Sequence, residues 1–275
     1  MEVLPSANDQ RRTALVTGAC SGIGLAMAVR LGSLGYTLIL VSARSVDLEA
    51  AAADIRHRFG VPVHTLVVDL ARPQAAAEVH RACTDLDLPV DILINNAGFF
   101  FFGEVADADP TRANSMLQLH VVTPSLLCTL FGRDMRSRGR GNILIVSSIS
   151  AWRDFPGIAY YGSSKKYLRG FARSLRSELH VYGVSVTCLA PGATATGLYD
   201  PNVVPVERAK KFGVMKDAAA VADAGLRAMF EGRAECVPGL FSRIMAELSA
   251  WTPQWAIDLL RSRAPWLPHQ PSGKP

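Results

Sequence analysis

Tyr161 and Lys165 lie four positions apart in a stretch with helical spacing. Residues at i and i+4 share one face of a helix, so the Lys165 ammonium is expected beside the Tyr161 phenol. A free tyrosine titrates near ~10, and making it exchange a proton near pH 7 requires about 4 kcal/mol. A cation about 4 Å away, at an effective dielectric constant of roughly 20, supplies about that much. The pair therefore predicts a phenol that gives a proton to a substrate or takes one from it.

Ser148 follows a short apolar run and precedes the Tyr161 helix. Ligands of α/β proteins bind at the carboxyl ends of strands, so its hydroxyl is expected where a substrate lies. There it would hold the oxygen of a carbonyl while Tyr161 protonates it. The alternative for Ser148 and its neighbour Ser147 is helix capping or hydrogen bonding within the loop, and we expect it to apply to one of the two.

A glycine-rich loop with the spacing G-x-x-x-G-x-G follows the first apolar run. Glycines in such a loop allow a tight turn and a close approach of a pyrophosphate, and the positive end of the next helix faces the phosphates. No Gly-Lys-Ser/Thr follows, which excludes a P-loop for phosphoryl transfer. The residues expected to contact a dinucleotide are Gly18, Ser21, Gly22, Ile23 and Gly24.

The second apolar run ends in Arg44 and Ser45, where NAD-specific proteins place a carboxylate for the ribose 2′-hydroxyl. An arginine there pairs with a 2′-phosphate, so NADP(H) is favoured over NAD(H). The alternative is that Arg44 is a solvated residue at the start of a helix. Asp69, after the third run, is a candidate partner for the adenine, and its alternative role is an N-cap for the following helix.

Apolar runs of strand length alternate with segments of helix length. The strands and helices that they predict must position the candidate catalytic and cofactor-binding residues. The runs are almost continuously apolar, as in residues 38–41, which is typical of parallel strands covered on both faces. The predicted fold is α/β, a doubly wound parallel sheet in a Rossmann-type three-layer sandwich. The expected strands are 14–17, 37–42, 63–68, 91–94, 142–146, 185–189 and 234–237, and the expected helices 22–34, 46–59, 73–86, 110–138 and 160–182.

One domain is expected, with a C-terminal helical extension. Residues 13–196 form its cofactor-binding and catalytic core, 197–262 form a substrate lid or excursion, and 263–275 form a disordered tail. Apolar residues with intervening charges in 238–260 fit a lid, a dimer contact, or a helix at a membrane surface.

The composition narrows the class of protein. Of 275 residues, 49% are hydrophobic and 19% charged, and the net charge of +5 is scattered, which argues against a nucleic-acid partner. The five cysteines contain no C-x-x-C pair and the histidines no H-E-x-x-H, so neither a disulfide framework nor a metal site is expected. Residues 1–12 lack the apolar core of a signal peptide, and no run approaches about 18 uninterrupted apolar residues. The expected location is the cytoplasm.

Taken together, these motifs resemble the short-chain dehydrogenase/reductase family over residues 13–196. Asn95-Asn96-Ala97-Gly98 resembles the family segment that buttresses the sheet and lines the adenine ribose. Tyr161 and Lys165 resemble its catalytic pair, and Ser148 its catalytic serine. The segment after the last long strand resembles the nicotinamide-side segment. The further cofactor contacts that the resemblance implies are Asn96, Ala97, Tyr161, Lys165, Pro191, Gly192, Thr194 and Thr196.

The sequence departs from the family at His120, where the family usually has an asparagine whose main-chain carbonyl holds a water in a proton relay. His120 is therefore a candidate catalytic residue, either preserving that relay or adding a titrating group. We favour the alternative, a histidine hydrogen-bonded within the helix packing.

Aromatic residues are expected around the mouth of the site, and they favour an apolar carbonyl or alcohol as substrate. They are Phe99, Phe100, Phe101, Phe102, Trp152, Phe155 and Tyr199, and half of the phenylalanine run is expected to fill the core instead.

The sequence thus predicts an oxidoreductase that uses NADP(H) to reduce a ketone, or to oxidise a secondary alcohol, with Tyr161 transferring the proton. The alternatives are a catalytically silent NADP-binding sensor or scaffold, and a β-ketoreductase acting on acyl thioesters. The resemblance implies a homodimer or homotetramer.

Overall fold

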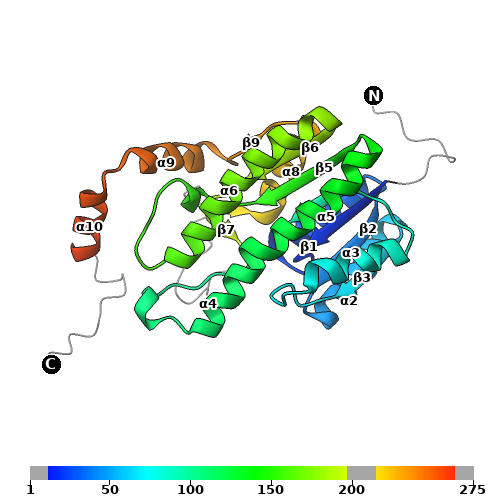
Figure 1. Ribbon diagram of the computed structural model, residues 1–275, viewed down its shortest axis with the longest axis horizontal. Coiled ribbons are helices and arrows are strands. Elements are labelled where there is room, and N and C mark those ends of the chain that lie inside the picture. Colours follow the sequence, from blue (N-terminus) through cyan, green and yellow to red (C-terminus); the bar gives the residue numbers. More distant parts are fainter. Residues whose placement is uncertain (1–11, 197–214, 264–275) are drawn as a thin grey trace.

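The computed structural model describes residues 12–196 and 215–263, drawn in colour in Figure 1. Tyr199, the first part of the expected excursion and nearly all of the expected tail lie outside the described residues.

One seven-stranded parallel sheet forms the centre of the molecule, with the strand order β3-β2-β1-β4-β5-β6-β9 (Figure 1). Every residue of β1, β2 and β4 is buried, as their apolar sequences predict. Strand order reverses between β1 and β4, which is where a doubly wound sheet opens a crevice at its carboxyl edge. The strands are β1 (Thr13–Thr17), β2 (Thr37–Ser42), β3 (Val63–Val67), β4 (Val90–Asn95), β5 (Gly141–Val146), β6 (Val184–Leu189) and β9 (Glu235–Cys236).

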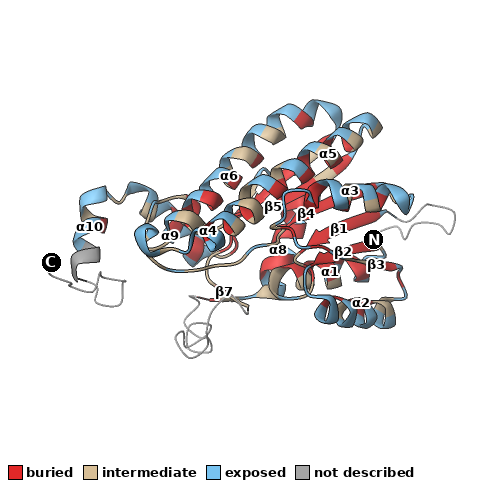
Figure 2. Ribbon diagram, turned by 60° about the horizontal axis from the view of Figure 1, so that its bottom comes forward, coloured by how far each residue is buried: buried red, intermediate tan, exposed pale blue. Residues whose placement is uncertain are grey.

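Helices cover both faces of the sheet (Figure 2). One core cluster joins the sheet to α1 (Gly22–Ser33), α2 (Ser45–Phe59) and α8 (Ala218–Phe230). The other joins its opposite face to α3 (Ala75–Asp85), α5 (Thr123–Arg138) and α6 (Ala159–Leu179). Two buried clusters on opposite sides of one sheet confirm the predicted three-layer arrangement.

Helix α2 illustrates how the sequence specifies these layers. Its buried residues Leu48, Ala52 and Ile55 recur at helical spacing, so one stripe of the helix faces the sheet. The helix ends at Gly60, whose φ of 62° is the left-handed conformation that stops a helix. At that end, Arg56 donates from Nη2 to the carbonyl of Val63 at 2.7 Å, which fastens α2 to the first residue of β3.

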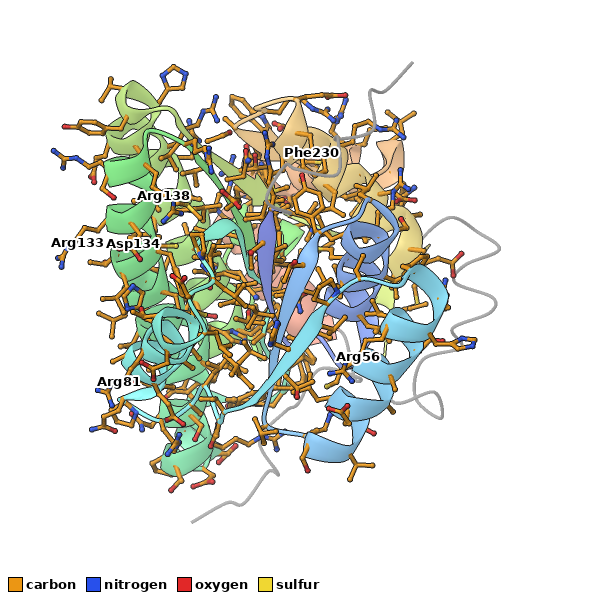
Figure 3. The ribbon with its side chains drawn as sticks, turned by 90° about the vertical axis from the view of Figure 1, so that its right-hand side faces the viewer. Arg56, Arg81, Arg133, Asp134, Arg138 and Phe230 are labelled. Carbon is orange, nitrogen blue, oxygen red and sulfur yellow. The ribbon has the colours of Figure 1, made fainter. Side chains whose placement is uncertain are left out.

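Basic residues lie on several elements. Figure 3 shows Arg81 and Arg133 on the adjacent helices α3 and α5, and Arg56 on α2 across the sheet. Arg138 at the end of α5 donates to the carbonyl of Val90, the first residue of β4, at 2.6 Å. Arg56 and Arg138 thus brace helix ends against the edge of the sheet where strands begin.

The helix expected over residues 110–138 has two α-helical parts. They are α4 (Pro110–Leu117) and α5, and the π-helical turn Gln118–Val122 joins them. Among the described residues, Pro110–Arg138 is the one helix long and apolar enough to cross a membrane, because an 18-residue window within it has a mean hydropathy of 1.3. It packs on α3 and α6 and 44% of its apolar window is buried inside the protein, so we assign it to the core.

The remaining described elements are short turns, a small second sheet and the two C-terminal helices. Short 3₁₀ turns occupy Val105–Asp107, Ile149–Ala151 and His180–Tyr182, and β7 (Thr194–Ala195) pairs in parallel with β8 (Lys216–Asp217). After β9, α9 (Leu240–Trp251) and α10 (Gln254–Arg263) extend from the body (Figure 1). Helix α9 buries the small residues Ser242 and Ala246 and exposes large apolar ones, with Trp251 85% exposed.

Candidate active site

A cleft of about 1020 Å³ opens at the carboxyl edge of the sheet, and nearly all of the predicted site residues line it. The catalytic candidates among them are Ser148, Tyr161, Lys165 and His120. The predicted cofactor contacts that line it are Gly18, Ser21, Gly22, Ile23, Arg44, Asp69, Asn96, Ala97, Tyr161, Lys165, Pro191, Gly192, Thr194 and Thr196. Two predicted cofactor residues, Gly24 and Ser45, do not line it: Gly24 is buried behind the loop, and Ser45 is an exposed residue that begins α2.

The glycine loop needs its glycines for two different reasons. Gly18 and Gly22 have φ values of 65° and 55°, which side chains other than glycine rarely adopt. At Gly24 a Cβ would lie 2.3 Å from the carbonyl oxygen of Gly18 and 2.4 Å from Nδ2 of Asn96. Gly24 therefore does not touch a ligand. Its role is to let α1 pack closely against the loop.

The loop is tied to the ends of β1 and β4 through Thr17. Its Oγ1 donates to the carbonyl of Ile94 at 3.1 Å and accepts from the backbone N–H groups of Asn96 and Ala97 at 2.9 and 3.1 Å. The Nδ2 of Asn96 donates to the carbonyl of Thr17 at 2.9 Å. Sequence reasoning missed Thr17, although it directly precedes the first glycine of the motif.

At the end of β2, the guanidinium of Arg44 lies exposed at the cleft. It donates from Nη2 to Sγ of Cys20 at 3.1 Å, and its Nε lies 3.2 Å from a carboxylate oxygen of Asp47. Cys20 also contacts Oγ of Ser42 at 3.1 Å, so the loop and β2 meet here. Sequence reasoning did not single out Cys20 or Ser42 for this corner.

Asp69 does not cap α3. That helix begins at Ala75 after Gln74, whereas Asp69 accepts a hydrogen bond from the N–H of Ala71 at 2.9 Å and thereby closes a turn after β3. Its predicted alternative role as a helix cap is wrong, because the chain makes this turn before the helix starts. We call the part of the cleft formed by residues 18–23, 42–44 and 68–70 the cofactor end.

Lys165 lies under Tyr161 at the start of α6 and is 5% exposed. Its Nζ donates to the carbonyl of Val146 at 3.1 Å and lies 5.6 Å from the centroid of the Tyr161 ring. Burial lowers the pKa of Lys165 to about 8 from its ordinary value of 10.5. A buried ammonium in a medium of low dielectric constant acts strongly on its neighbours.

The two serines after β5 have different surroundings. Ser147 is buried and donates from Oγ to the carbonyl of Lys165 at 2.7 Å, so it ties β5 to α6. Ser148 lines the cleft, and its Oγ also accepts from the N–H of Ser150 at 3.2 Å. Both serines line the cleft and both make local hydrogen bonds, because Ser148 caps the turn Ile149–Ala151 through that bond, so the expectation that capping or loop bonding applies to only one of them is wrong.

His120 is 1% exposed and lies in the π-helical turn before α5. Its Nε2 accepts from the N–H of Phe99 at 3.1 Å, so in the neutral ring Nδ1 carries the hydrogen and donates to Oγ of Ser164 at 3.0 Å. The Ser164 hydroxyl in turn donates to the carbonyl of Tyr161 at 2.7 Å. Burial and the Lys165 charge hold the pKa of His120 well below its usual 6.5, so the ring is neutral near pH 7.

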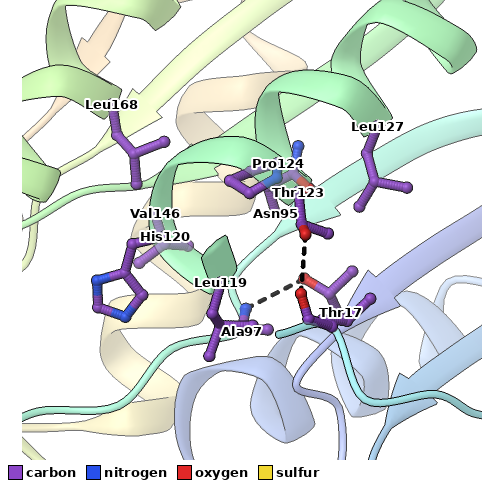
Figure 4. Close-up of a pocket in the computed structure, with 11 residues that line it drawn as sticks. Thr17, Asn95, Ala97, Leu119, His120, Thr123, Pro124, Leu127, Val146 and Leu168 are labelled. Atoms are coloured by element: carbon purple, nitrogen blue, oxygen red, sulfur yellow. Dashed lines mark hydrogen bonds between the residues drawn. The ribbon is translucent and has the colours of Figure 1, made fainter. Parts of the chain in front are cut away.

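A cavity of about 10 Å³ lies beside His120, between β4, β5 and α5, with Thr17, Asn95 and Thr123 among the residues that line it (Figure 4). That is about the space that one water molecule needs. The Nδ2 of Asn95 donates to Sγ of Cys128 at 3.2 Å, while its Oδ1 is buried and has no protein partner. A water in this cavity would therefore have a polar atom to bind.

Aromatic side chains form much of the opposite end of the cleft. Phe100 packs edge-on against Tyr161, with the ring centroids 5.0 Å apart, and Phe99, Phe102 and Phe155 also line the cleft. None of the four phenylalanines at 99–102 is fully buried, so the expectation that half of them fill the core is wrong. The loop lies over a pocket rather than over packed strands.

Two of the expected aromatic wall residues do not line the cleft. Phe101 packs against Tyr160 and Arg112, and Trp152 lies beneath the guanidinium of Arg169, which is 3.7 Å from the indole centroid. Arg169 is itself paired with Glu235 of β9. Phe101 and Trp152 therefore pack against neighbouring side chains outside the cleft.

Helices α9 and α10 complete the cleft, as a lid would. Their lining residues are Met245, Leu248, Ser249, Thr252, Ala256 and Ile257. Arg153, just after the turn that begins at Ile149, lines the same region and was missed by sequence reasoning. We call the part formed by the lining residues within 99–102, 149–158 and 245–257 the substrate end.

Comparisons with known proteins agree with this geometry. The family model of the short chain dehydrogenases matches residues 12–203. The chain belongs to this family. It is 31% identical over 203 residues to dehydrogenase/reductase SDR family member 4 of Sus scrofa, covering 74% of this chain and 72% of the relative. The human protein of that name is 32% identical over 193 residues, with coverages of 70% and 68%.

Among solved structures, a short-chain dehydrogenase from Sphingobium yanoikuyae in complex with NADPH superposes with a TM-score of 0.77. It is 27% identical, and the match covers 96% of this chain and all of the other. Family and structure together make this chain an NAD(P)-dependent oxidoreductase.

The cofactor end of this short-chain dehydrogenase fits a nicotinamide dinucleotide. Helix α1 has no acidic residue in its first turn, and the side chain of Ser21 does not cap it, so its first N–H groups are available to phosphates. Gly18 and Gly22 keep the loop free of side chains at that point. In the described residues, no group of three or more His, Cys, Asp or Glu side chains is arranged to hold a metal ion.

Proposed function

We propose that this dehydrogenase uses NADP(H) to reduce a ketone on an apolar substrate, or to oxidise the corresponding secondary alcohol. One observation carries the proposal: Tyr161, Lys165 and Ser148 line a single cleft that is continuous with the glycine loop. A dinucleotide bound at the cofactor end reaches these residues without leaving the cleft. The nicotinamide cofactor supplies the hydride when it is bound.

In the reductive direction, Tyr161 gives its phenolic proton to the carbonyl oxygen as that oxygen gains negative charge. Ser148 donates a hydrogen bond to the same oxygen and orients it. Lys165 favours the ionised phenol, because its buried ammonium lies 5.6 Å from the ring centroid. In the oxidative direction, each step is reversed.

His120 acts through position rather than through proton exchange. Its ring bridges the N–H of Phe99 and the hydroxyl of Ser164, and that hydroxyl holds the carbonyl of Tyr161. The imidazole is neutral near pH 7 because burial lowers its pKa. We therefore assign His120 a positioning role that joins the start of α6 to the phenylalanine loop.

A preference for NADP(H) follows from the charge at the end of β2. Arg44 lines the cofactor end, and no carboxylate of β2 itself competes for the ribose. A guanidinium pairs with a 2′-phosphate through charge-assisted hydrogen bonds. With NADP(H) as cofactor, we expect reduction to be the cellular direction.

The substrate end supports an apolar substrate because most of its side chains are apolar. Its apolar lining residues are Phe99, Phe100, Phe102, Ile149, Phe155, Ile158, Met245, Leu248, Ala256 and Ile257. Such walls bind ketones through the hydrophobic effect and leave orientation to a few polar groups.

We also propose a homodimer or homotetramer. The outer faces of α5 and α6 expose apolar side chains, among them Leu126 and Tyr167, each 42% exposed. Tyr167 stacks on Phe171 of the same helix at 5.7 Å between centroids, which gives α6 a flat apolar surface. Light scattering coupled to gel filtration measures the assembly directly.

The proposed reaction is tested by NADPH consumption over a panel of aryl and alicyclic ketones, with wild type and Tyr161→Phe side by side. The expected result is turnover by wild type and a loss of about 1000-fold or more in Tyr161→Phe, with NADPH binding kept. If both proteins bind NADPH and both are inert across the panel, a silent binding protein replaces the enzyme. If only carrier-bound β-ketoacyl thioesters are reduced at their ketone, the enzyme is a β-ketoreductase of acyl thioesters.

A further inference from the structure

Among the described residues, Arg153 is the one charged side chain that lines the substrate end of the cleft. The other charged residues that line the cleft are Arg44 and Asp69 at its cofactor end and Lys165 beneath Tyr161. Arg153 follows the short turn Ile149–Ala151, which begins immediately after Ser148. A guanidinium thus lies on the same loop as the proposed substrate-orienting serine, among apolar side chains.

Neighbouring charges do not neutralise it. Asp154, the next residue, is paired with Lys166, whose Nζ lies 3.1 Å from both of its carboxylate oxygens. Arg169, on the nearby face of α6, is paired with Glu235. Within the described residues Arg153 has no ion-pair partner, although Asp154 and Arg169 both have one.

The hydrogen bonds of Arg153 are incomplete. Its Nη2 donates to Oε1 of Gln254 on α10 at 2.9 Å, and Nε2 of Gln254 donates to Oδ1 of Asp258 at 3.2 Å. Its Nε is buried and has no acceptor in the protein. A buried donor left without a partner costs free energy, and an acceptor brought by a ligand removes that cost.

No lid side chain in the described residues accepts from Nε of Arg153. Ser249 and Thr252 line the cleft near Arg153, but their hydroxyls donate to carbonyls of their own helix, Ala246 at 2.7 Å and Leu248 at 3.1 Å. The other lid residues that line the cleft are apolar. An anionic group entering between the lid and the Arg153 loop would therefore meet one guanidinium and no competing carboxylate.

We infer that Arg153 recognises a carboxylate on the substrate, so that the enzyme acts on an apolar ketone or alcohol that carries a carboxylate away from the reacting carbon. The planar guanidinium matches a carboxylate in geometry and charge, and the low-polarity walls strengthen the pair. Gln254 holds the guanidinium toward the cleft from the lid. This inference rests on the proposed ketone reduction, whose substrate class it narrows.

Two pairs of probes test it: 4-acetylbenzoate and 4-benzoylbenzoate, each against its methyl ester, with NADPH and the full-length protein. Ester and acid share the carbonyl and differ in charge. Wild type is expected to show a higher kcat/KM for the acid of at least one pair. Arg153→Met is expected to lower kcat/KM for that acid by about 10- to 100-fold, mainly through KM, and to leave its ester within about threefold.

Matched variants separate charge recognition from other effects. Arg243→Met removes the same charge from an exposed position on α9 that does not line the cleft, and it should leave the acid-to-ester ratio unchanged. Arg153→Lys keeps a charge and should keep part of the preference. Gln254→Ala breaks the contact between Arg153 and α10, and it should keep most of the preference for the acid. If Gln254→Ala and Arg153→Met lower kcat/KM for acid and ester alike, Arg153 only holds the lid in place through Gln254. That result would overturn the inference.

A binding measurement separates this inference from the proposed reaction. Calorimetry on NADPH-loaded Tyr161→Phe, with and without Arg153→Met, reports the dissociation constants of acid and ester without turnover. If no ketone is reduced but the acid binds more tightly than the ester only when Arg153 is present, the carboxylate site stands and the proposed reaction fails. If the esters are reduced and the acids have no Arg153-dependent advantage in binding or turnover, the reaction stands and the carboxylate site is wrong.

Discussion

At the cofactor end of the cleft the walls are segments that directly follow β1, β2 and β3, whereas at the substrate end they are side chains from loops and from the C-terminal helices. The first end is built where strands stop, and its geometry is set by the sheet. The second is assembled from segments that meet only in the folded chain. Arg153 and Gln254, for example, are 101 positions apart.

The difference shows how each end is stabilised. Thr17 joins β1 to β4 and to the two residues after it through three hydrogen bonds, so the cofactor end is held by the sheet itself. At the substrate end, the backbone bond from Gly103 to Gly157 and the side-chain bond from Arg153 to Gln254 hold exposed segments together. We therefore expect substitutions at the two ends to separate cofactor affinity from substrate affinity.

Among substitutions that separate the two ends of the cleft, the largest expected effect is at Gly24. In Gly24→Ala the new Cβ would lie 2.3 Å from a backbone oxygen of Gly18, so α1 or the loop must move. We expect NADPH affinity to fall by about 100-fold or more, because the phosphates depend on that geometry. Fluorescence titration with NADPH measures it. Gly170→Ala is the control, since a Cβ there meets nothing within 4 Å.

Arg44 is expected to have the next largest effect. Replacing it with alanine removes the cation from the end of β2, and NADPH affinity should fall by about 10- to 100-fold while NADH affinity changes little. Arg58→Ala is the control: it removes an equal charge from the exposed surface of α2 and should change neither NADPH affinity nor NADH affinity. Equal losses for NADPH and NADH would mean that Arg44 does not read the 2′-phosphate.

His120 joins the start of α6 to the phenylalanine loop, and its effect should depend on pH. The folded protein keeps its pKa well below 6.5, so between that folded value and 6.5 the unfolded chain binds the proton and the folded protein does not. Stability is therefore lost as pH falls below 6.5, by up to about 1.4 kcal/mol for each pH unit. Thermal unfolding between pH 7 and 5 should show this loss in wild type and a smaller loss in His120→Gln. A wild-type curve with the same slope as the variant would contradict the neutral, buried ring.

The smallest expected effect is at Gly157, beneath the phenylalanine loop. Its φ is 83°, and a Cβ there would lie 2.7 Å from the Phe102 ring, so Gly157→Ala should displace Phe102. We expect KM for the ketone to change by a few-fold, equivalent to about 1 kcal/mol, with NADPH affinity kept. Gly103→Ala, which has open space around its Cβ, should leave both constants unchanged.

The cofactor end of the cleft could be predicted from the sequence more fully than the substrate end. The buried strands and the glycine loop were predicted because their signals are local: continuous apolar runs, and glycines at fixed spacing. Ser45 and Gly24 were placed in the cofactor site by motif alone, and the structure puts one in the solvent and the other behind the loop. A motif gives the order of residues but not which side of the backbone faces the ligand.

Fewer features of the substrate end could be predicted from the sequence. The core positions expected for half of residues 99–102 were wrong, because the loop lies over the cleft and not over strands. Arg153 carried no local signal at all, since its partner comes from a helix near the other end of the chain. The tautomer of His120 likewise depends on Phe99 and Ser164, which only the packed fold brings to it.

The central claim is that Lys165 makes the Tyr161 phenol acidic enough to exchange a proton with the substrate. The direct measurement is a pH titration of protein labelled with ¹³C at tyrosine Cζ and loaded with NADP⁺, with Tyr161→Phe to assign the signal. The account predicts that Tyr161 titrates well below the ordinary phenol value of ~10 and returns toward it in Lys165→Met. A Tyr161 signal that titrates as an ordinary phenol, unchanged by Lys165→Met, would contradict the account.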